Sequence, residues 1–180
     1  DGCKDDTEDN DDDGDGILDG MDDCDDYSTK HNWSSGLAND YDSDGCHDSD
    51  EDIDDDSDGI LDEFDSCPRY PYNRTWTSSQ QNDHDGDGCD NNDDDADDDN
   101  DGINDVDEEG DELDRCPRGE TGWTSDSTVD QDGDGCLDSS EDLDDDGDGI
   151  LDFTDDCLTG ALDWNSQTET DRDGDGCRDF

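Results

Sequence analysis

Aspartates recur along the chain at alternate positions, followed by a glycine and by two further acidic residues. The stretch from Asp144 to Asp155 reads DDDGDGILDFTD and fits the pattern D-x-D-x-D-G-x-x-D-x-x-[DE]. In a curled backbone these carboxylates point at one centre, position 7 adds a main-chain carbonyl, and the glycine at position 6 permits the sharp turn. Hard oxygen ligands favour Ca²⁺ over zinc or copper, and Mg²⁺ fits less well because it demands a strict octahedron. The pattern therefore predicts a calcium-binding loop.

Seven complete loops of this kind occur, each with glycine at position 6. They begin at Asp11, Asp40, Asp54, Asp83, Asp97, Asp130 and Asp144. The chain opens at position 5 of another loop and stops at position 10 of a further one, so we expect a window of a longer array. A solvated acidic tract is the alternative, but such a tract would not require glycine and the aspartates to hold the same positions in every loop. The repetition predicts at least seven bound Ca²⁺ ions.

The predicted ligands are positions 1, 3, 5, 7, 9 and 12 of every loop, with the main-chain oxygen acting at position 7. Up to the loop from Asp40 they are Asp1, Cys3, Asp5, Glu8, Asp11, Asp13, Asp15, Ile17, Asp19, Asp22, Asp40, Asp42, Asp44, Cys46, Asp48 and Glu51. In the next three loops they are Asp54, Asp56, Asp58, Ile60, Asp62, Asp65, Asp83, Asp85, Asp87, Cys89, Asn91, Asp94, Asp97, Asp99, Asp101, Ile103, Asp105 and Glu108. In the remainder they are Asp130, Asp132, Asp134, Cys136, Asp138, Glu141, Asp144, Asp146, Asp148, Ile150, Asp152, Asp155, Asp171, Asp173, Asp175, Cys177 and Asp179.

The loops are of two types. First-type loops carry cysteine at position 7, and second-type loops, which follow two residues later, carry isoleucine there. A less acidic linker with one tryptophan completes each period. One continuous array over 1–180 is expected, with approximate repeats 3–45, 46–88, 89–135 and 136–176, the third lengthened by an insertion around Glu109–Glu112.

Two further sets of aspartates lie where a first-type loop passes to a second-type loop. They occupy position 2 of the second-type loop and the residue two before it: Asp12, Asp55, Asp98 and Asp145, and Asp9, Asp52, Asp95 and Asp142. A single-ion loop needs neither set. We therefore predict a second calcium ion shared across each junction, the alternative being aspartates that face solvent.

Charge and composition exclude several classes of protein. The 180 residues contain 67 Asp and Glu against 8 Lys and Arg, a net charge of −59, which would repel nucleic acid. Only 22% are hydrophobic and no apolar run approaches the length of a membrane span, so neither a large core nor a transmembrane segment is expected. Because like charges this dense repel, a compact chain needs external cations.

The nine cysteines favour disulfides and an oxidising compartment over zinc ligation, which needs closely spaced pairs. Regular secondary structure should be scarce, because no stretch has sustained helical periodicity and Gly and Asp interrupt every candidate strand. The predicted fold class is irregular: calcium-wrapped tandem repeats stapled by disulfides into an elongated rod.

The strings DDDSDGILDEFDSCP (54–68) and DHDGDGC (83–89) resemble thrombospondin type 3 repeats, as do 11–24 and 144–157. The resemblance covers essentially the whole chain. It implies a chain wrapped around calcium ions, with few helices or strands and with sequential disulfides, in a secreted or surface protein. The linkers here are longer than those of the animal repeats and carry tryptophan, so the chain looks more like microbial surface arrays.

Two registers of sequential disulfides fit the spacing. We predict Cys24–Cys46, Cys67–Cys89, Cys116–Cys136 and Cys157–Cys177, because each bridge then closes a linker that has no metal of its own, with Cys3 pairing upstream. Closing about 20 residues contributes roughly 3 kcal/mol. The alternative begins at Cys3–Cys24 and leaves Cys177 unpaired.

The expected function is that of an extracellular calcium-binding structural module, a rod, spacer or fibre segment on a cell surface or in matrix. An acidic calcium-storing or mineral-nucleating protein is one alternative, and an adhesion module using the tryptophan linkers is another. Neighbouring copies in a fibre are candidate partners, and glycans are expected on the sequons at Asn32 and Asn73. No nucleophile and base are paired, so enzyme activity is not expected.

Overall fold

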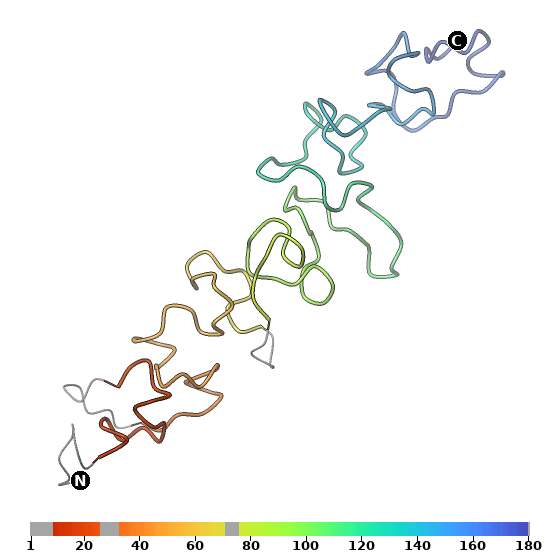
Figure 1. The fold of residues 1–180 in the computed structure, drawn as a ribbon. Helices are drawn as coiled ribbons and strands as arrows, with labels where there is room; N and C mark the ends of the chain where they lie inside the picture. Colours follow the sequence, from red (N-terminus) through yellow and green to blue (C-terminus); the bar gives the residue numbers. More distant parts are fainter. Residues whose placement is uncertain (1–8, 26–32, 71–75, 180) are drawn as a thin grey trace. The chain divides into compact units, whose positions relative to one another are not determined.

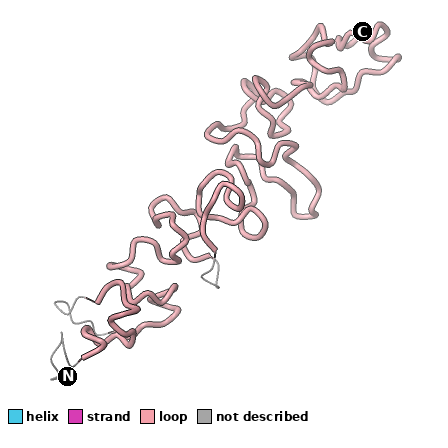
Figure 2. The backbone as a smooth tube through the Cα atoms, viewed as in Figure 1, coloured by secondary structure: helices cyan, strands magenta, loops and turns pink. Residues whose placement is uncertain are grey.

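The computed structural model describes residues 9–25, 33–70 and 76–179, which form loops and turns throughout (Figure 2). These residues contain no helix and no strand, and their sole β-bridge is an isolated antiparallel one between Val106 and Glu112. The prediction of an irregular fold is confirmed. No helix among them is long and apolar enough to cross a membrane.

The chain divides into two compact units, Asp1–Asp94 and Asp95–Phe180, coloured red to yellow-green and green to blue in Figure 1. Two disulfides lie in each unit: Cys24–Cys46 and Cys67–Cys89 in the first, Cys116–Cys136 and Cys157–Cys177 in the second. The predicted pairing is therefore confirmed, and the register that begins at Cys3–Cys24 is excluded.

Burial is inverted relative to an ordinary globular domain. The buried hydrophobic residues among those described are Tyr41 and three disulfide cysteines, whereas twenty buried residues are polar or charged, nearly all of them aspartates. Large apolar side chains such as Phe64 and Phe153 are 67% and 80% exposed. Since burial of apolar side chains is the usual source of stability, this chain must depend largely on other contributions, of which disulfides and hydrogen bonds are present.

Two residues of every described loop adopt a left-handed backbone conformation. Position 6 is always glycine, with φ of 102° at Gly59 and 95° at Gly149. Position 4 also has positive φ, 58° at Ser43 and 60° at Asn100, and is glycine in most other loops. The sequence pattern anticipated the turn at position 6 but not at position 4, although the restriction of position 4 to Gly, Ser and Asn was its signal.

Position 9 closes the mouth of each loop by two hydrogen bonds. In the loop from Asp54, the backbone N–H of Asp62 donates to the carbonyl of Ile53 (3.0 Å), and Asp62 Oδ1 accepts from the N–H of Asp55 (2.9 Å). The same two bonds recur at Asp19, Asp48, Asn91, Asp105, Asp138, Asp152 and Asp179. Position 9 therefore has a structural role that either Asp or Asn can fill.

Candidate metal centres

Carboxylates at positions 1, 3 and 5 converge in the loops. Each such residue offers an oxygen, and the three oxygens of a loop lie within 4.8 Å of one another. The loops concerned include Asp11, Asp13 and Asp15; Asp40, Asp42 and Asp44; Asp54, Asp56 and Asp58; and Asp83, Asp85 and Asp87. Oxygen clusters of this size and charge can hold a metal ion, as the alternating spacing predicted.

The second-type loop from Asp54 has several carboxylate oxygens for which the fold offers no hydrogen bond. Asp58 is fully buried; its Oδ1 accepts from the N–H of Ile60 (2.6 Å), but its Oδ2 has no partner among the described residues. Asp54 Oδ1 and Asp65 Oδ2 are likewise buried and without a hydrogen-bond partner there. Burying unpaired anionic oxygens is costly, so this set fits a hard divalent cation.

Position 12 joins the cluster in the second-type loops. Asp65 Oδ1 accepts from the N–H of Cys67 (2.6 Å), and burial followed by the charges of Asp56 and Asp58 raises its pKa to about 7. Asp22 and Asp155 make the same bond to Cys24 and Cys157. A carboxylate next to a cysteine thus closes each of these loops.

The insertion changes which residue plays this part in the loop from Asp97. Glu108, assigned to position 12 from the sequence, is exposed, whereas Asp114 is fully buried and accepts from the N–H of Cys116 (2.6 Å). The charges of Asp99 and Asp101 contribute, after burial, to raising the pKa of Asp114 to about 7. Asp114, and not the exposed Glu108, occupies the place of the closing carboxylate of the other second-type loops, because the extra residues form a small hairpin before it. In this hairpin the Asp107 N–H donates to the carbonyl of Asp111 (2.9 Å).

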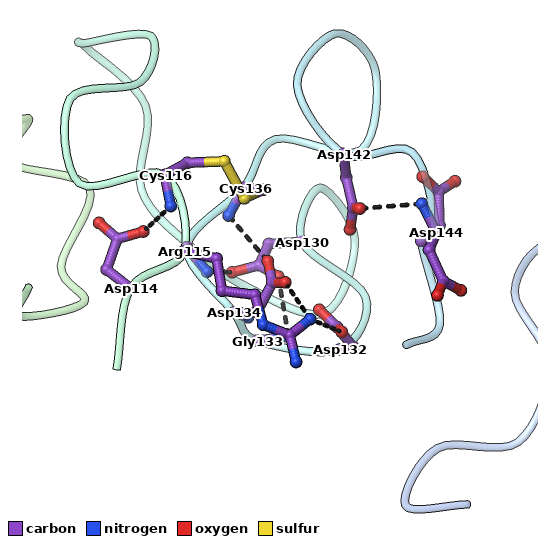
Figure 3. Close-up of polar contacts among 12 residues, drawn as sticks. Asp114, Arg115, Cys116, Asp130, Asp132, Gly133, Asp134, Cys136, Asp142 and Asp144 are labelled. Atoms are coloured by element: carbon purple, nitrogen blue, oxygen red, sulfur yellow. Dashed lines mark hydrogen bonds and ion pairs between the residues drawn. A yellow bond between two sulfur atoms is a disulfide. The ribbon is translucent and has the colours of Figure 1, made fainter. Parts of the chain in front are cut away.

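First-type loops also differ from the expectation, because they close at position 13. Asp142 Oδ1 accepts from the N–H of Asp144 (2.9 Å), as Figure 3 shows, and the Asp142 charge helps raise the pKa values of Asp132 and Asp134, for which burial is the main cause. Glu141, at position 12, instead accepts from the N–H of Glu120 (2.6 Å). A tight turn whose N–H groups at positions 12 and 13 both donate to the carbonyl of Leu137 explains the shift.

The same displacement occurs at the other first-type loops. Asp52 accepts from the N–H of Asp54 (3.0 Å), and its charge, with that of Asp42, raises the pKa of Asp44 to about 6 after the effect of burial. Asp94, a predicted position-12 ligand, is exposed. Asp52 and Asp142, which the sequence assigned to a shared junction ion, therefore also act on the carboxylates of the first-type loops, while Asp52 still lies within 4.8 Å of Asp48 and Asp55 at the junction.

Each closing carboxylate of a second-type loop also packs against the next first-type loop. A Cβ added to Gly88 would lie 2.1 Å from Asp65 Oδ1, and the N–H of Ser66 donates to the carbonyl of Asp87 (2.6 Å). The same contacts recur at Gly45, Gly135 and Gly176 with Asp22, Asp114 and Asp155. These glycines are needed for space as well as for φ, and the contact adjoins the disulfide.

A serine two residues after each tryptophan joins the linker to both neighbouring loops. Ser125 N–H donates to the carbonyl of Asp101 (2.8 Å), and its hydroxyl donates to Asp130 Oδ2 (2.5 Å). Ser35, Ser78 and Ser166 make the equivalent bonds. Sequence reasoning missed this role. The motif Trp-x-Ser recurs in every linker, with its serine five residues before the first-type loop, and this recurrence could have indicated a structural role for the serine.

Arginine supplies local positive charge beside one first-type loop. In Figure 3 the Arg115 side chain, next to the Cys116–Cys136 disulfide, reaches Asp134 (2.8 Å) and approaches Asp132 (3.9 Å). Burial raises the pKa of Asp132 to about 6 despite this cation. One guanidinium therefore leaves most of the negative charge of this cluster uncompensated.

Some predicted residues lie outside the described residues: Asp1, Cys3, Asp5 and Glu8, and the sequon residues Asn32 and Asn73. The main-chain carbonyls predicted as ligands at position 7, such as those of Ile60 and Ile150, accept no backbone hydrogen bond in the described parts of the chain. They are thus available to a cation. No family model matches the chain, and no curated protein matches it.

Proposed function

We propose that the chain is an extracellular calcium-binding structural module, built as a thrombospondin-type-3-like array in which Ca²⁺ takes the place of an apolar core. The observation that carries the proposal is the set of buried carboxylate oxygens at Asp54, Asp58 and Asp65 that have no hydrogen-bond partner among the described residues. When bound, Ca²⁺ would compensate these charges and fix the loop around itself.

Asp54, Asp58 and Asp65 would hold the ion in this second-type loop, with the Ile60 carbonyl as a further ligand. One carboxylate oxygen of Asp56, Oδ2, already accepts a hydrogen bond from the N–H of Tyr70 (2.7 Å). In the first-type loops the corresponding residues are positions 1, 3, 5 and 13. One ion per loop gives the seven complete loops seven ions.

The four disulfides support the extracellular assignment, because such bonds persist in oxidising compartments. A rod or spacer is the role we favour, since loops, linkers and disulfides repeat along the chain in a fixed order. Calcium storage or mineral nucleation is the competing role.

Calcium titration of the refolded chain followed by native mass spectrometry and small-angle scattering tests the proposal. We expect a defined number of ions, at least one per complete loop, and a fall in the radius of gyration as they bind. Graded binding without compaction would favour storage, and absence of binding at millimolar Ca²⁺ would refute the proposal. Asp58→Asn should remove one ion, whereas Asp126→Asn, at an exposed linker residue, should remove none.

A further inference from the structure

The second-type loop from Asp54 presents three large apolar side chains to solvent. Ile53, the residue before the loop, is 67% exposed, Leu61 at position 8 is 39% exposed, and Phe64 at position 11 is 67% exposed. We call these three residues the first apolar patch. In a chain with so few hydrophobic residues, apolar side chains left in water at neighbouring places require an explanation.

Backbone hydrogen bonds bring the first apolar patch together. The N–H of Asp62 donates to the carbonyl of Ile53 (3.0 Å), so that Ile53 and Leu61 lie side by side at the mouth of the loop. The N–H of Phe64 donates to the carbonyl of Leu61 (2.7 Å), which closes a tight turn. A pocket of about 220 Å³ lies here, lined by Ile53 and Leu61 together with Asp52, Asp62 and Glu63.

The second-type loop from Asp144, in the other compact unit, carries an equivalent second apolar patch. It consists of Leu143, Leu151 and Phe153, which are 66%, 42% and 80% exposed. The N–H of Asp152 donates to the carbonyl of Leu143 (2.9 Å), and the N–H of Thr154 donates to that of Leu151 (2.8 Å). The same backbone frame therefore presents the same kind of side chain twice.

The loop fold itself does not require these apolar residues. In the loop from Asp97, Ala96 stands at the place of Ile53 and Asn104 at the place of Leu61, yet the N–H of Asp105 makes the same bond to the carbonyl of Ala96 (2.9 Å). In the loop from Asp11, the residue before the loop is Asn10. Two loops out of four thus form without a complete patch, so the patches serve something other than the loop.

The first patch combines an apolar centre with a negative rim. Glu63, which lines the pocket, is exposed and forms no ion pair among the described residues. Exposed apolar patches rimmed by polar residues mark interaction sites. A second copy of this chain, with its net charge of −59, would be repelled, and so would the anionic headgroups of a membrane surface. The charge favours a partner that is positive around an apolar side chain.

We propose that the two apolar patches dock a basic segment of another protein, in which lysine or arginine residues flank a large apolar side chain. That side chain occupies the pocket between Ile53 and Leu61, and its basic neighbours pair with the rim at Glu63. In the other unit, Leu143 and Leu151 take the same part. The inference goes beyond the proposed calcium-binding function, because none of these apolar residues is a predicted ligand.

Calorimetric titration of the full chain at saturating calcium and physiological ionic strength tests the proposal. The probe is a synthetic peptide with two lysines on each side of a leucine-phenylalanine pair, compared with a peptide of equal charge that has two serines in place of the pair. We expect two sites per chain for the first peptide and binding at least tenfold weaker for the second.

Substitutions locate the sites. Leu61→Asn, which copies the natural residue Asn104, should remove one site, Leu151→Asn should remove the other, and the double variant should retain neither. Leu37→Asn, at a leucine that is 64% exposed outside both patches, is the matched control and should leave both sites intact. Glu63→Gln should weaken binding at the first patch about tenfold or more without removing any apolar side chain.

Three results would overturn the proposal. Equal binding of the two peptides, or peptide binding that the double variant leaves unchanged, would show that only the overall negative charge attracts them. Dimerisation of the chain that the double variant abolishes, measured by analytical ultracentrifugation, would identify a second copy as the occupant. The number of calcium ions on each variant, counted by native mass spectrometry, reports whether its loops are intact, and Glu63→Gln keeps the test decisive if a leucine variant misfolds.

Discussion

The loops from Asp130 and Asp144 lie next to each other in sequence and share one pattern, yet their first carboxylates differ. Asp130 accepts hydrogen bonds from the N–H groups of Gly133, Asp134 and Gly135 and from the hydroxyl of Ser125. Asp144 accepts from Gly149 N–H, and its buried Oδ1 has no hydrogen-bond partner among the described residues. In this pair, hydrogen bonds from the chain hold the position-1 carboxylate of the first-type loop, whereas that of the second-type loop keeps a buried oxygen without one.

A disulfide bond also distinguishes the two loops. Position 7 of the first-type loop is Cys136, buried and bonded to Cys116, whereas position 7 of the second-type loop is Ile150. The glycine at position 6 follows the same division, since a Cβ on Gly135 would collide with Asp114 while one on Gly149 would meet nothing within 4 Å. In this pair, one sequence motif thus gives a loop braced by a disulfide and a loop without one, whose first carboxylate has an unpaired buried oxygen.

Calcium removal should separate the two roles most strongly. In excess chelator, we expect the second-type loops from Asp54 and Asp144 to lose amide protection first and most, because their carboxylates then repel without compensation. The first-type loops from Asp83 and Asp130 should retain part of their protection through the disulfide and the position-1 carboxylate. Hydrogen exchange with mass spectrometry, with and without chelator, measures this. Equal loss of protection in both types would contradict the comparison.

Substitution of the position-6 glycine by alanine should give the second-largest effect, a loss of stability that differs between the two loop types. Gly59→Ala places a side chain at φ of 102° in open space and should cost about 1–2 kcal/mol. Gly88→Ala adds a collision with Asp65 and should cost about 2–5 kcal/mol in total. Thermal unfolding at saturating calcium compares them, and equal costs would show that Asp65 does not pack on Gly88.

The closing carboxylate of the loop from Asp97 gives a third, smaller effect. Asp114→Asn should weaken calcium binding at one site by about tenfold or more, because a buried ligand charge is lost, an effect of roughly 1.4 kcal/mol or above. Glu108→Gln, at an exposed residue, is the matched control and should leave the affinity unchanged. Calorimetric titration measures both. A larger effect of Glu108→Gln would restore the original assignment of position 12.

Proton competition should produce the weakest effect. Burial raises the pKa values of Asp65 and Asp114 to about 7, above the ordinary value of 3.8, so the compact metal-free chain is stabilised by their protonation. That contribution is fully present below pH 3.8 and is lost as pH rises through about 7, where ionised carboxylates favour either unfolding or calcium binding. Calcium affinity should therefore fall as pH drops below about 7 and be nearly constant above pH 8.

Calorimetry in buffers of different ionisation enthalpy measures the protons released on calcium binding. We expect release at pH 6 and almost none at pH 8. Asp114→Asn should reduce the release at pH 6, whereas Asp126→Asn should not, because hydrogen bonds from Thr128 lower the pKa of Asp126. Proton release that does not vary with pH would contradict the raised values.

Sequence reasoning succeeded where residues of one type recur at a constant spacing. Carboxylates at alternate positions, such as Asp54, Asp56 and Asp58, do converge, and the four cysteine pairs were predicted correctly. It did not anticipate that Asp142 and Asp114 would lie at the ends of their loops, because a tight turn places Asp142 and a hairpin places Asp114, and neither follows from counting residues. Of the eight junction aspartates predicted to share an ion, Asp52 does lie with Asp48 and Asp55, and the shared ion itself stays a prediction.

The short hairpin at 107–111 has a practical consequence. The closing carboxylate lies a fixed number of residues before the cysteine, as Asp114 does before Cys116. Its sequence separation from the start of the loop varies. Extra residues between them emerge at an exposed turn around Glu109 and Gly110 and leave the carboxylate cluster intact. This turn, and the matching place after Phe64 or Phe153, is therefore where a reporter peptide or fluorophore can be grafted without disturbing the array.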